Sequence, residues 1–232
     1  MHFCRDTRLI LVSAVYFFSD WHEKFKPRNT KQDIFHVSAT ETAKVEMMHM
    51  VADFSYAANS RCQAIELPYK RNGLSMFIIL PNRGTSLAQL EEELTADDFV
   101  NVRERFGGFY EAEVWLWLPK FKLDEQLSLV EALAALGIDD LFRYGEADLS
   151  GIDRTRDLYV SAVVHRAVVA VDENGTEAAA ATALECAYGC MAMPERPPAE
   201  FRADRPFVFF IRHNATNSIL FIGRLTRPPS RQ

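Results

Sequence analysis

The sequence predicts an α+β fold, in which many strands are interspersed with a few short helices. Runs rich in β-branched and aromatic residues recur along the chain, whereas apolar residues at helical spacing are confined to a few stretches. The 232 residues are 48% hydrophobic and 25% charged, which is ample apolar material for a core. No internal repeat and no linker-like stretch divides the sequence, so we expect one domain over residues 1–232.

The N-terminal apolar run, LILVSAVYFF at residues 9–18, follows Arg5 and Arg8. Basic residues ahead of an apolar stretch also occur in secretory signal peptides, but the SDWHEK sequence after this run lacks a small-residue cleavage site. The run is too short to span a membrane, and its valine and aromatic content favours a buried strand. We therefore expect a strand here, with no signal peptide and no membrane segment in this chain.

Further strand signals recur along the sequence. Asn72-Gly73 lies between the apolar runs at residues 64–69 and 74–80, which predicts a hairpin. The β-branched run LYVSAVVHRAVVAV, at residues 158–171, predicts a central strand. The runs FVFFI and ILFIG, with a short polar connection between them, predict a second hairpin near the C-terminus. Weaker strand patterns occur at residues 44–57 and 114–121.

Helix signals are local and short. Ser86 and Gln89 form an S-x-x-Q capping box before a run of leucines at helical spacing. Thr95 and Asp98 predict a second helix N-terminus. A further helix with leucines on one face is expected to end at Gly137, which is well placed as its C-terminal cap.

Composition excludes several classes of function. The formal net charge is −6 and the sequence has no basic stripe, so nucleic-acid binding has little support. The four cysteines, Cys4, Cys62, Cys186 and Cys190, are too few for a disulfide scaffold and form no C-x-x-C pair. P-loop, G-x-S-x-G and H-E-x-x-H motifs are absent. We therefore expect no metal, no cofactor and no enzymatic activity.

The segment at residues 172–206 has no obvious place in a core, and loops of this length are usually functional. One interpretation is a helix that begins with Thr176 as its N-cap and continues through the alanine run. The other is a latent strand, because small side chains with a period of two could enter an existing sheet. One face would then carry Thr176, Ala178, Ala180 and Thr182, and the other Glu177, Ala179, Ala181 and Ala183.

The stretch LYVSAVVHRAVVAVDENGTEAAAATA, at residues 158–183, resembles the strand and hinge of serpins. RPFVFFIRHNATNSILFIGRL, at residues 205–225, resembles their C-terminal hairpin, and LILVSAVYFFSDWHEKF, AIELPYK and LPKFKLDEQ match further serpin segments in the same order. The resemblance covers nearly the whole chain, and EFRADRPFVFFIRHN is most similar to arthropod and tick members. It implies the multi-sheet serpin fold with an exposed reactive-centre loop at about residues 172–206. It also implies that this chain lacks the N-terminal helices of serpins, one of which binds heparin in some members.

The resemblance also implies a function, which is inhibition of serine proteases as a suicide substrate. A protease cleaves the loop and becomes acylated, and the hinge then inserts into the main sheet as an extra strand. The alternatives are a non-inhibitory carrier or chaperone, or an inactive fragment, and we expect residues 1–232 alone to be cut rather than to trap protease. The hinge maps onto Glu173, Gly175, Thr176, Glu177, Ala178, Ala179, Ala180, Ala181 and Thr182.

Residues outside the hinge match the region where the serpin sheet opens. Glu173 matches the acidic residue at the base of the loop, and Lys120 matches its basic partner. Trp21 matches the tryptophan at the top of the sheet, and His165 matches the histidine beneath the opening. Ser13 departs from the pattern, because serpins usually have an asparagine there to bond the histidine, and a hydroxyl substitutes for it only in part.

The usual hinge length places the scissile bond between Gly189 and Cys190, with Met191, Met193 and Arg196 as alternatives. Gly189 would suit an elastase-like protease and Arg196 a trypsin-like one. We expect the full-length protein to be secreted and extracellular. Two N-x-T acceptors are then glycosylation candidates, of which we expect Asn214 to carry a glycan and Asn174 to carry little or none.

Overall fold

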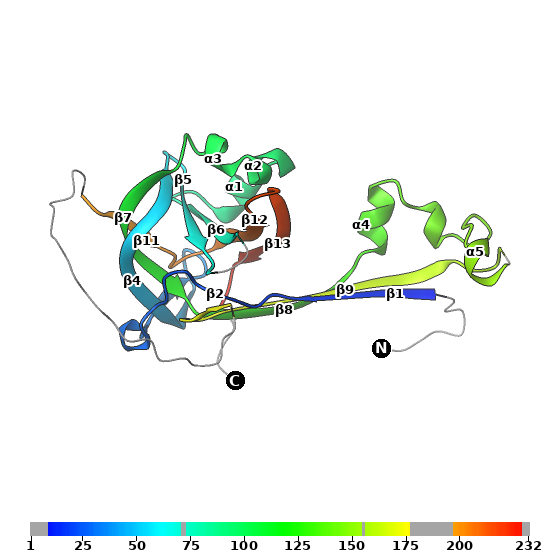
Figure 1. Cartoon of the computed structure of the whole chain (residues 1–232), viewed down its shortest axis with the longest axis horizontal. Helices are drawn as coiled ribbons and strands as arrows, with labels where there is room; N and C mark the ends of the chain where they lie inside the picture. The colour runs from blue at the N-terminus through cyan, green and yellow to red at the C-terminus, as the bar shows by residue number, and fades with distance from the viewer. Residues whose placement is uncertain (1–8, 71–72, 155, 177–196, 229–232) are drawn as a thin grey trace. The chain divides into compact units, whose positions relative to one another are not determined.

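The computed structural model of the chain describes residues 9–70, 73–154, 156–176 and 197–228 (Figure 1). The chain divides into two compact units, one made of residues 1–17 and 123–169 and the other of residues 18–122 and 170–232. Strands dominate both units, and the α-helices described are only four to six residues long. None of these helices is long and apolar enough to cross a membrane. A single domain over residues 1–232 stays a prediction.

The first unit is built on long strands that lie side by side (Figure 1). Strand β1 runs parallel to β9, with Leu9 opposite Val160 and Tyr16 opposite Val168, and β8 also pairs with β9. The 158–171 run therefore forms a central strand, as predicted. The elements are β1 (Leu9–Tyr16), β8 (Phe121–Ser128), α4 (Val130–Ala135), η2 (Asp140–Phe142), α5 (Ser150–Asp153) and β9 (Val160–Val171), with the first residues of β8 and the last of β9 in the second unit.

The second unit contains an eight-stranded sheet in the order β11-β7-β4-β5-β6-β12-β13, with β3 also paired to β4. The short strand β10 pairs with β2 and, through Thr176, with Val171 at the end of β9. The strands are β2 (Ser19–Asp20), β3 (Lys31–His36), β4 (Thr42–Ala58), β5 (Cys62–Pro68), β6 (Leu74–Pro81), β7 (Tyr110–Pro119), β10 (Gly175–Thr176), β11 (Ala199–Arg202), β12 (Phe207–His213) and β13 (Ser218–Leu225). The helices are η1 (Pro27–Asn29), α1 (Leu87–Glu91), α2 (Ala96–Val100) and α3 (Val102–Arg105).

The core of the second unit lies on β6 and β12. All eight residues of β6 are buried, which explains its nearly continuous apolar sequence. Phe77 on β6 stacks on Phe210 of β12 with ring centroids 5.0 Å apart. Leu90 and Val102, from the short helices, pack against this pair, and Figure 1 shows α1, α2 and α3 together beside these strands.

The local helix signals are confirmed. Both capping boxes form, with Ser86 and Thr95 accepting the backbone N–H of Gln89 and Asp98. Gly137 follows α4 at a φ of 89°, a left-handed conformation that glycine adopts without strain. Strand β8, by contrast, has no strand signal of its own, because most of its side chains are polar and exposed.

Candidate functional site

Residues 172–176, here called the loop base, leave β9 and lead into the long loop that the sequence predicts. Asp172 forms a turn, because its Oδ1 accepts the backbone N–H groups of Asn174 at 2.8 Å and Gly175 at 3.2 Å. The N–H of Asp172 donates to the carbonyl of Gly175 at 2.9 Å. An aspartate side chain that satisfies the backbone in this way reverses the chain within a few residues. The turn returns Thr176 beside Val171, the last residue of β9.

Gly175 is the tightest point of the loop base. It lies opposite Asp20 in the antiparallel β10–β2 pair, with a φ of 155°. A Cβ added there would lie 2.1 Å from the Ser19 carbonyl oxygen and 2.9 Å from the backbone nitrogen of Trp21. Only glycine fits such an approach of two backbones. The glycine of the predicted hinge is therefore fixed by the packing of β10 on β2.

Trp21 holds the loop base through both its backbone and its ring. Its backbone N–H donates to the carbonyl of Asn174 at 2.9 Å, and its indole N–H donates to the carbonyl of Asp172 at 3.0 Å. The ring stacks on Tyr69 with centroids 4.6 Å apart and an interplanar angle of 8°. Trp21 is only 2% exposed, so its donors would be costly to leave unpaired. The tryptophan singled out from the sequence is thus a direct clamp on the loop base.

Tyr69 extends this clamp to Thr176. The Tyr69 hydroxyl is hydrogen-bonded to Oγ1 of Thr176 at 2.9 Å, and Thr176 is completely buried. Burial raises the pKa of Tyr69, an effect that exceeds the opposing effect of the Thr176 hydrogen bond, so the phenol stays neutral. Thr176 is extended and bonded through its side chain, which favours the strand interpretation over the helix at this position.

Glu173 anchors the loop base by charge. Lys120 Nζ lies 2.9 Å from Oε2 of Glu173, and the hydroxyl of Thr30 donates to Oε1 at 2.8 Å. The backbone N–H of Phe25 donates to the Glu173 carbonyl at 2.9 Å. Burial acts to raise the pKa of Glu173, but the hydrogen bonds from Lys120 and Thr30 outweigh it and hold this pKa below its usual value. The predicted Glu173–Lys120 pair therefore forms around an ionised carboxylate.

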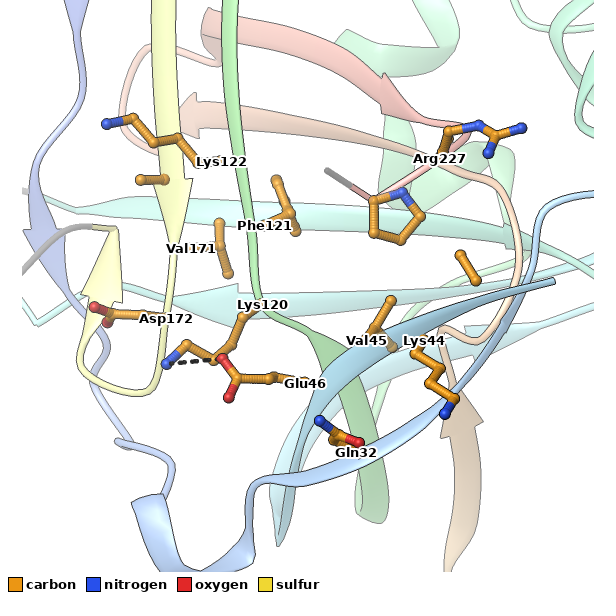
Figure 2. A pocket seen from close by; sticks show the side chains of 13 residues that line it. Gln32, Lys44, Val45, Glu46, Lys120, Phe121, Lys122, Val171, Asp172 and Arg227 are labelled. Carbon is orange, nitrogen blue, oxygen red and sulfur yellow. Dashed lines mark ion pairs between the residues drawn. The ribbon is translucent and has the colours of Figure 1, made fainter. Parts of the chain in front are cut away.

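A cavity of about 690 Å³ borders the loop base on the Lys120 side (Figure 2). Figure 2 shows Phe121 and Val171 between charged side chains, and its dashed line joins Lys120 to Glu46 at 3.9 Å. The Lys120 side chain is 32% exposed, whereas the Glu173 side chain is 10% exposed. Lys120 therefore faces solvent while its closer partner is enclosed.

Ser13 and His165 lie opposite each other in the parallel β1–β9 ladder. Ser13 is exposed and His165 is half-buried. Across the described part of the chain, no hydrogen bond joins their side chains. The structure thus places the two residues side by side, but without the hydrogen bond that the serine was expected to form in place of an asparagine. Strands β1 and β9 are direct backbone neighbours.

The remaining predicted positions are divided between described and undescribed residues. Glu177 to Thr182 of the hinge and the Gly189–Cys190 bond lie outside the described residues. Asn174 is half-buried in the loop base, whereas Asn214 is exposed after β12 and its Nδ2 donates to Ser75 Oγ at 2.8 Å.

Sequence reasoning missed three members of the site, which are Thr30, Tyr69 and Asp172. Tyr69 is the second-last residue of the AIELPYK segment, and its position directly after a strand was the available signal for a role at a strand end. Thr30 gave no signal, because a single threonine in a polar stretch is unremarkable without knowledge of its distant partner Glu173, 143 residues away along the chain.

Comparison with known proteins identifies the family. The model described as serpin (serine protease inhibitor) matches residues 2–228. The leukocyte elastase inhibitor of Equus caballus is 43% identical over 230 residues, which are 96% of this chain and 59% of that protein. The protein of the same name from Xenopus tropicalis is 44% identical over 228 residues, or 96% and 58% of the two chains. The chain thus spans less than two thirds of the length of these relatives.

Solved structures agree with this assignment. Uncleaved ovalbumin has a TM-score of 0.81 at 32% identity, covering 96% of this chain and 55% of the ovalbumin chain. Native protease nexin-1, solved with heparin, has a TM-score of 0.80 at 32% identity, covering 96% and 57%. The resemblance and the α+β fold expected from the sequence are confirmed, and the chain belongs to the serpin family of serine protease inhibitors.

Proposed function

We propose that the full-length protein inhibits a serine protease as a suicide substrate, by cleavage of its loop and insertion of the hinge between β1 and β9. The observation that carries this proposal is the state of Thr176. This residue starts the small-residue face of the hinge and is already buried, paired with Val171 and bonded to Tyr69. An inserting strand would continue from this point.

The strands on either side of the proposed insertion support the same mechanism. Strands β1 and β9 are directly paired, so no strand lies between them in this state. Insertion requires their ladder to separate, and the hinge would then supply backbone partners to both edges. The alanines and threonine of the hinge add little bulk to either face. Side chains of this kind can enter a sheet without displacing its neighbours.

The target proposed here is an elastase-like serine protease. Gly189 before the scissile bond suits a shallow specificity pocket, and several similar proteins carry the name leukocyte elastase inhibitor. Arg196 would instead favour a trypsin-like enzyme, and Met191 and Met193 are the remaining candidates. The released fragment distinguishes these bonds by its N-terminal residue.

The test uses a full-length form, in which the chain follows an N-terminal part like that of its relatives. This protein is incubated with leukocyte elastase and, separately, with trypsin, and the products are separated under denaturing conditions. We expect a covalent complex with elastase at a stoichiometry near one, and a released fragment that begins at Cys190. Cleavage of the loop without any covalent complex would instead support the non-inhibitory carrier or chaperone.

We also propose that the full-length protein is secreted and glycosylated at Asn214, with little or no glycan at Asn174. Asn214 is exposed, whereas Asn174 is half-buried and its carbonyl accepts the N–H of Trp21. A glycan on Asn174 would crowd the loop base. Glycopeptide mass spectrometry of the protein from a secretory host measures both sites, with Asn214→Gln as the control. Full occupancy of Asn174 together with retained protease trapping would contradict this placement of the hinge.

A further inference from the structure

Asp204 is a buried carboxylate that belongs neither to the loop base nor to the hinge. It lies two residues after the end of β11 and is only 2% exposed. Arg83 Nη2 lies 2.7 Å from Oδ2 of Asp204, and Arg205 Nη1 lies 2.9 Å from Oδ1. Arg202 Nε lies 3.6 Å from Oδ2. Three arginines therefore surround one enclosed carboxylate, and we call these four residues the Asp204 cluster.

The Asp204 cluster joins three separate segments of the second unit. Arg202 is the last residue of β11, Arg205 lies two residues before β12, and Arg83 lies two residues after β6. Arg205 Nε also donates to the carbonyl of Pro81, the last residue of β6, at 2.8 Å. All eight residues of β6 are buried. The cluster thus connects the end of β11 to a strand that lies wholly within the core.

The backbone of Asp204 adds a link to β3. Its carbonyl accepts the N–H of His36, the last residue of β3, at 2.7 Å, and its N–H donates to the Arg202 carbonyl at 2.9 Å. Arg202 is in turn ion-paired to Asp33 of β3. The side chain and the backbone of Asp204 therefore both have partners, and a buried polar residue satisfied in this way is held in one position.

Strand β11 has little support apart from the Asp204 cluster. It is four residues long and lies at the end of the strand order, where β7 is its only paired strand in the described part of the chain. A short segment with so few contacts opens more readily than a core strand. The reactive loop rejoins the sheet through β11, while Thr176 is fixed at the other end of the loop. The proposed scissile bond, Gly189–Cys190, lies between these two points.

We propose that Asp204 is a positioning residue for protease inhibition, which acts through Arg83 by fixing the point where the reactive loop rejoins the sheet. This inference rests on the proposed function and concerns the side of the scissile bond that is away from the hinge. A loop held at both ends samples fewer conformations, so less entropy is lost when a protease binds it. The Asp204 cluster therefore sets how fast the protease captures the loop. Trapping after cleavage depends on the hinge, because cleavage disconnects the hinge from β11.

The test measures the second-order rate and the stoichiometry with which the full-length form inhibits leukocyte elastase. Asp204→Asn keeps the shape of the side chain but removes its charge, and it should lower the rate by about tenfold, well within what a small misplacement can cost. Arg83→Gln alters a side chain that is 68% exposed, and it should lower the rate by about threefold. The stoichiometry should stay at the parent value, because the hinge is unchanged.

Two further variants serve as controls. Arg83→Lys keeps a cation near Asp204, and it should recover much of the rate that Arg83→Gln loses. Arg224→Gln breaks the Arg224–Glu91 pair, which joins atoms 2.9 Å apart, at an arginine of similar exposure on β13 of the same sheet. This variant should inhibit at the parent rate. Melting temperatures of all variants show whether the fold is retained.

A purely structural role for the Asp204 cluster would lower the melting temperature of Arg83→Gln and leave its rate of inhibition at the parent value. That result would refute the positioning role while the proposed function stands. A raised stoichiometry would place the effect on hinge insertion, and an equal loss of rate in Arg224→Gln would make it unspecific, so either would refute the role as well. If Asp204→Asn does not fold, the Arg83 variants still decide. If the parent forms no complex with elastase, the proposed function fails and this inference fails with it.

Discussion

The loop base and the β1–β9 ladder are held together in contrasting ways. The loop base is fixed by buried side chains. Trp21 and Tyr69 form hydrogen bonds to it, and Glu173, which belongs to it, is ion-paired with Lys120. The β1–β9 ladder is a parallel backbone pairing, and four large apolar side chains of β1 are exposed in this chain, which spans 59% of the length of its Equus caballus relative. These are Leu11, Val12, Val15 and Tyr16, with exposures of 43%, 73%, 37% and 54%.

This difference matches what the proposed mechanism demands of each region. A pivot must stay in place while the hinge moves, which requires specific buried contacts. Two strands that must separate are better held by backbone hydrogen bonds, because the inserting strand can form the same hydrogen bonds with each of them. The predictions below test the two regions separately.

The largest expected effect is at the tightest contact of the loop base. Gly175→Ala places a methyl group against the Ser19 carbonyl, so we expect the free energy of unfolding to fall by about 3 kcal/mol. Urea unfolding measures this change. The control is Gly151→Ala, because no atom beyond its chain neighbours and its own helix backbone lies within 4 Å of a Cβ added at Gly151. Similar losses from both substitutions would show that the loop base is not tightly packed.

A smaller effect is expected at the indole of Trp21. Trp21→Phe retains an aromatic ring over Tyr69 but leaves the Asp172 carbonyl without its donor, which should cost about 1–2 kcal/mol of unfolding free energy. Trp115→Phe, at an exposed tryptophan, should change this free energy by less than about 0.5 kcal/mol. Thermal unfolding of the two variants compares them directly. An equal cost would mean that the Trp21 hydrogen bond adds nothing.

The smallest effect concerns the charge of Glu173, and it depends on pH. The pKa of Glu173 is lowered in the folded protein, so its ionised form stabilises the fold above the ordinary carboxyl pKa of about 4.3. This contribution disappears as the pH falls through the lower folded pKa. We expect Glu173→Gln to cost about 1 kcal/mol at pH 7, after allowance for solvent around Lys120, and less below about pH 4.

Unfolding free energies of the parent and of Glu173→Gln, measured from neutral pH to about pH 3, check this dependence. The control is Asp124→Asn, which breaks the exposed Arg166–Asp124 pair of the other unit and should have little effect at any pH. A difference between parent and Glu173→Gln that grows as the pH falls would have the wrong sign for an ionised Glu173.

The sequence predicted the elements whose signals are local. Both capping boxes, the pairing of β5 with β6 and the cap at Gly137 depend on nearby residues, and all of them form. Strand β8 was not predicted from its pattern, because an exposed polar strand owes its conformation to pairing with β9. Such pairing is not encoded within the segment itself.

The site was predictable only where a family motif marked a residue. Trp21, Lys120 and Glu173 were assigned together and do meet around the loop base. Tyr69 and Thr30 were missed, since each acts through a partner more than a hundred residues away. Thr176 itself is unsuitable for a substitution that tests insertion, because an arginine there would disrupt its buried hydrogen bond to Tyr69 before any insertion began.

The central claim is that the hinge enters the sheet with one defined face inward. The most direct measurement compares Ala180→Arg with Ala179→Arg in the full-length form, as the stoichiometry of elastase inhibition. Ala180 shares the period-two face of Thr176, so an arginine there would be buried unpaired, and the protein should become a cleaved substrate that forms no complex. Ala179 lies on the opposite face, so its variant should trap the protease as the parent does. Equal trapping by both variants would contradict strand insertion.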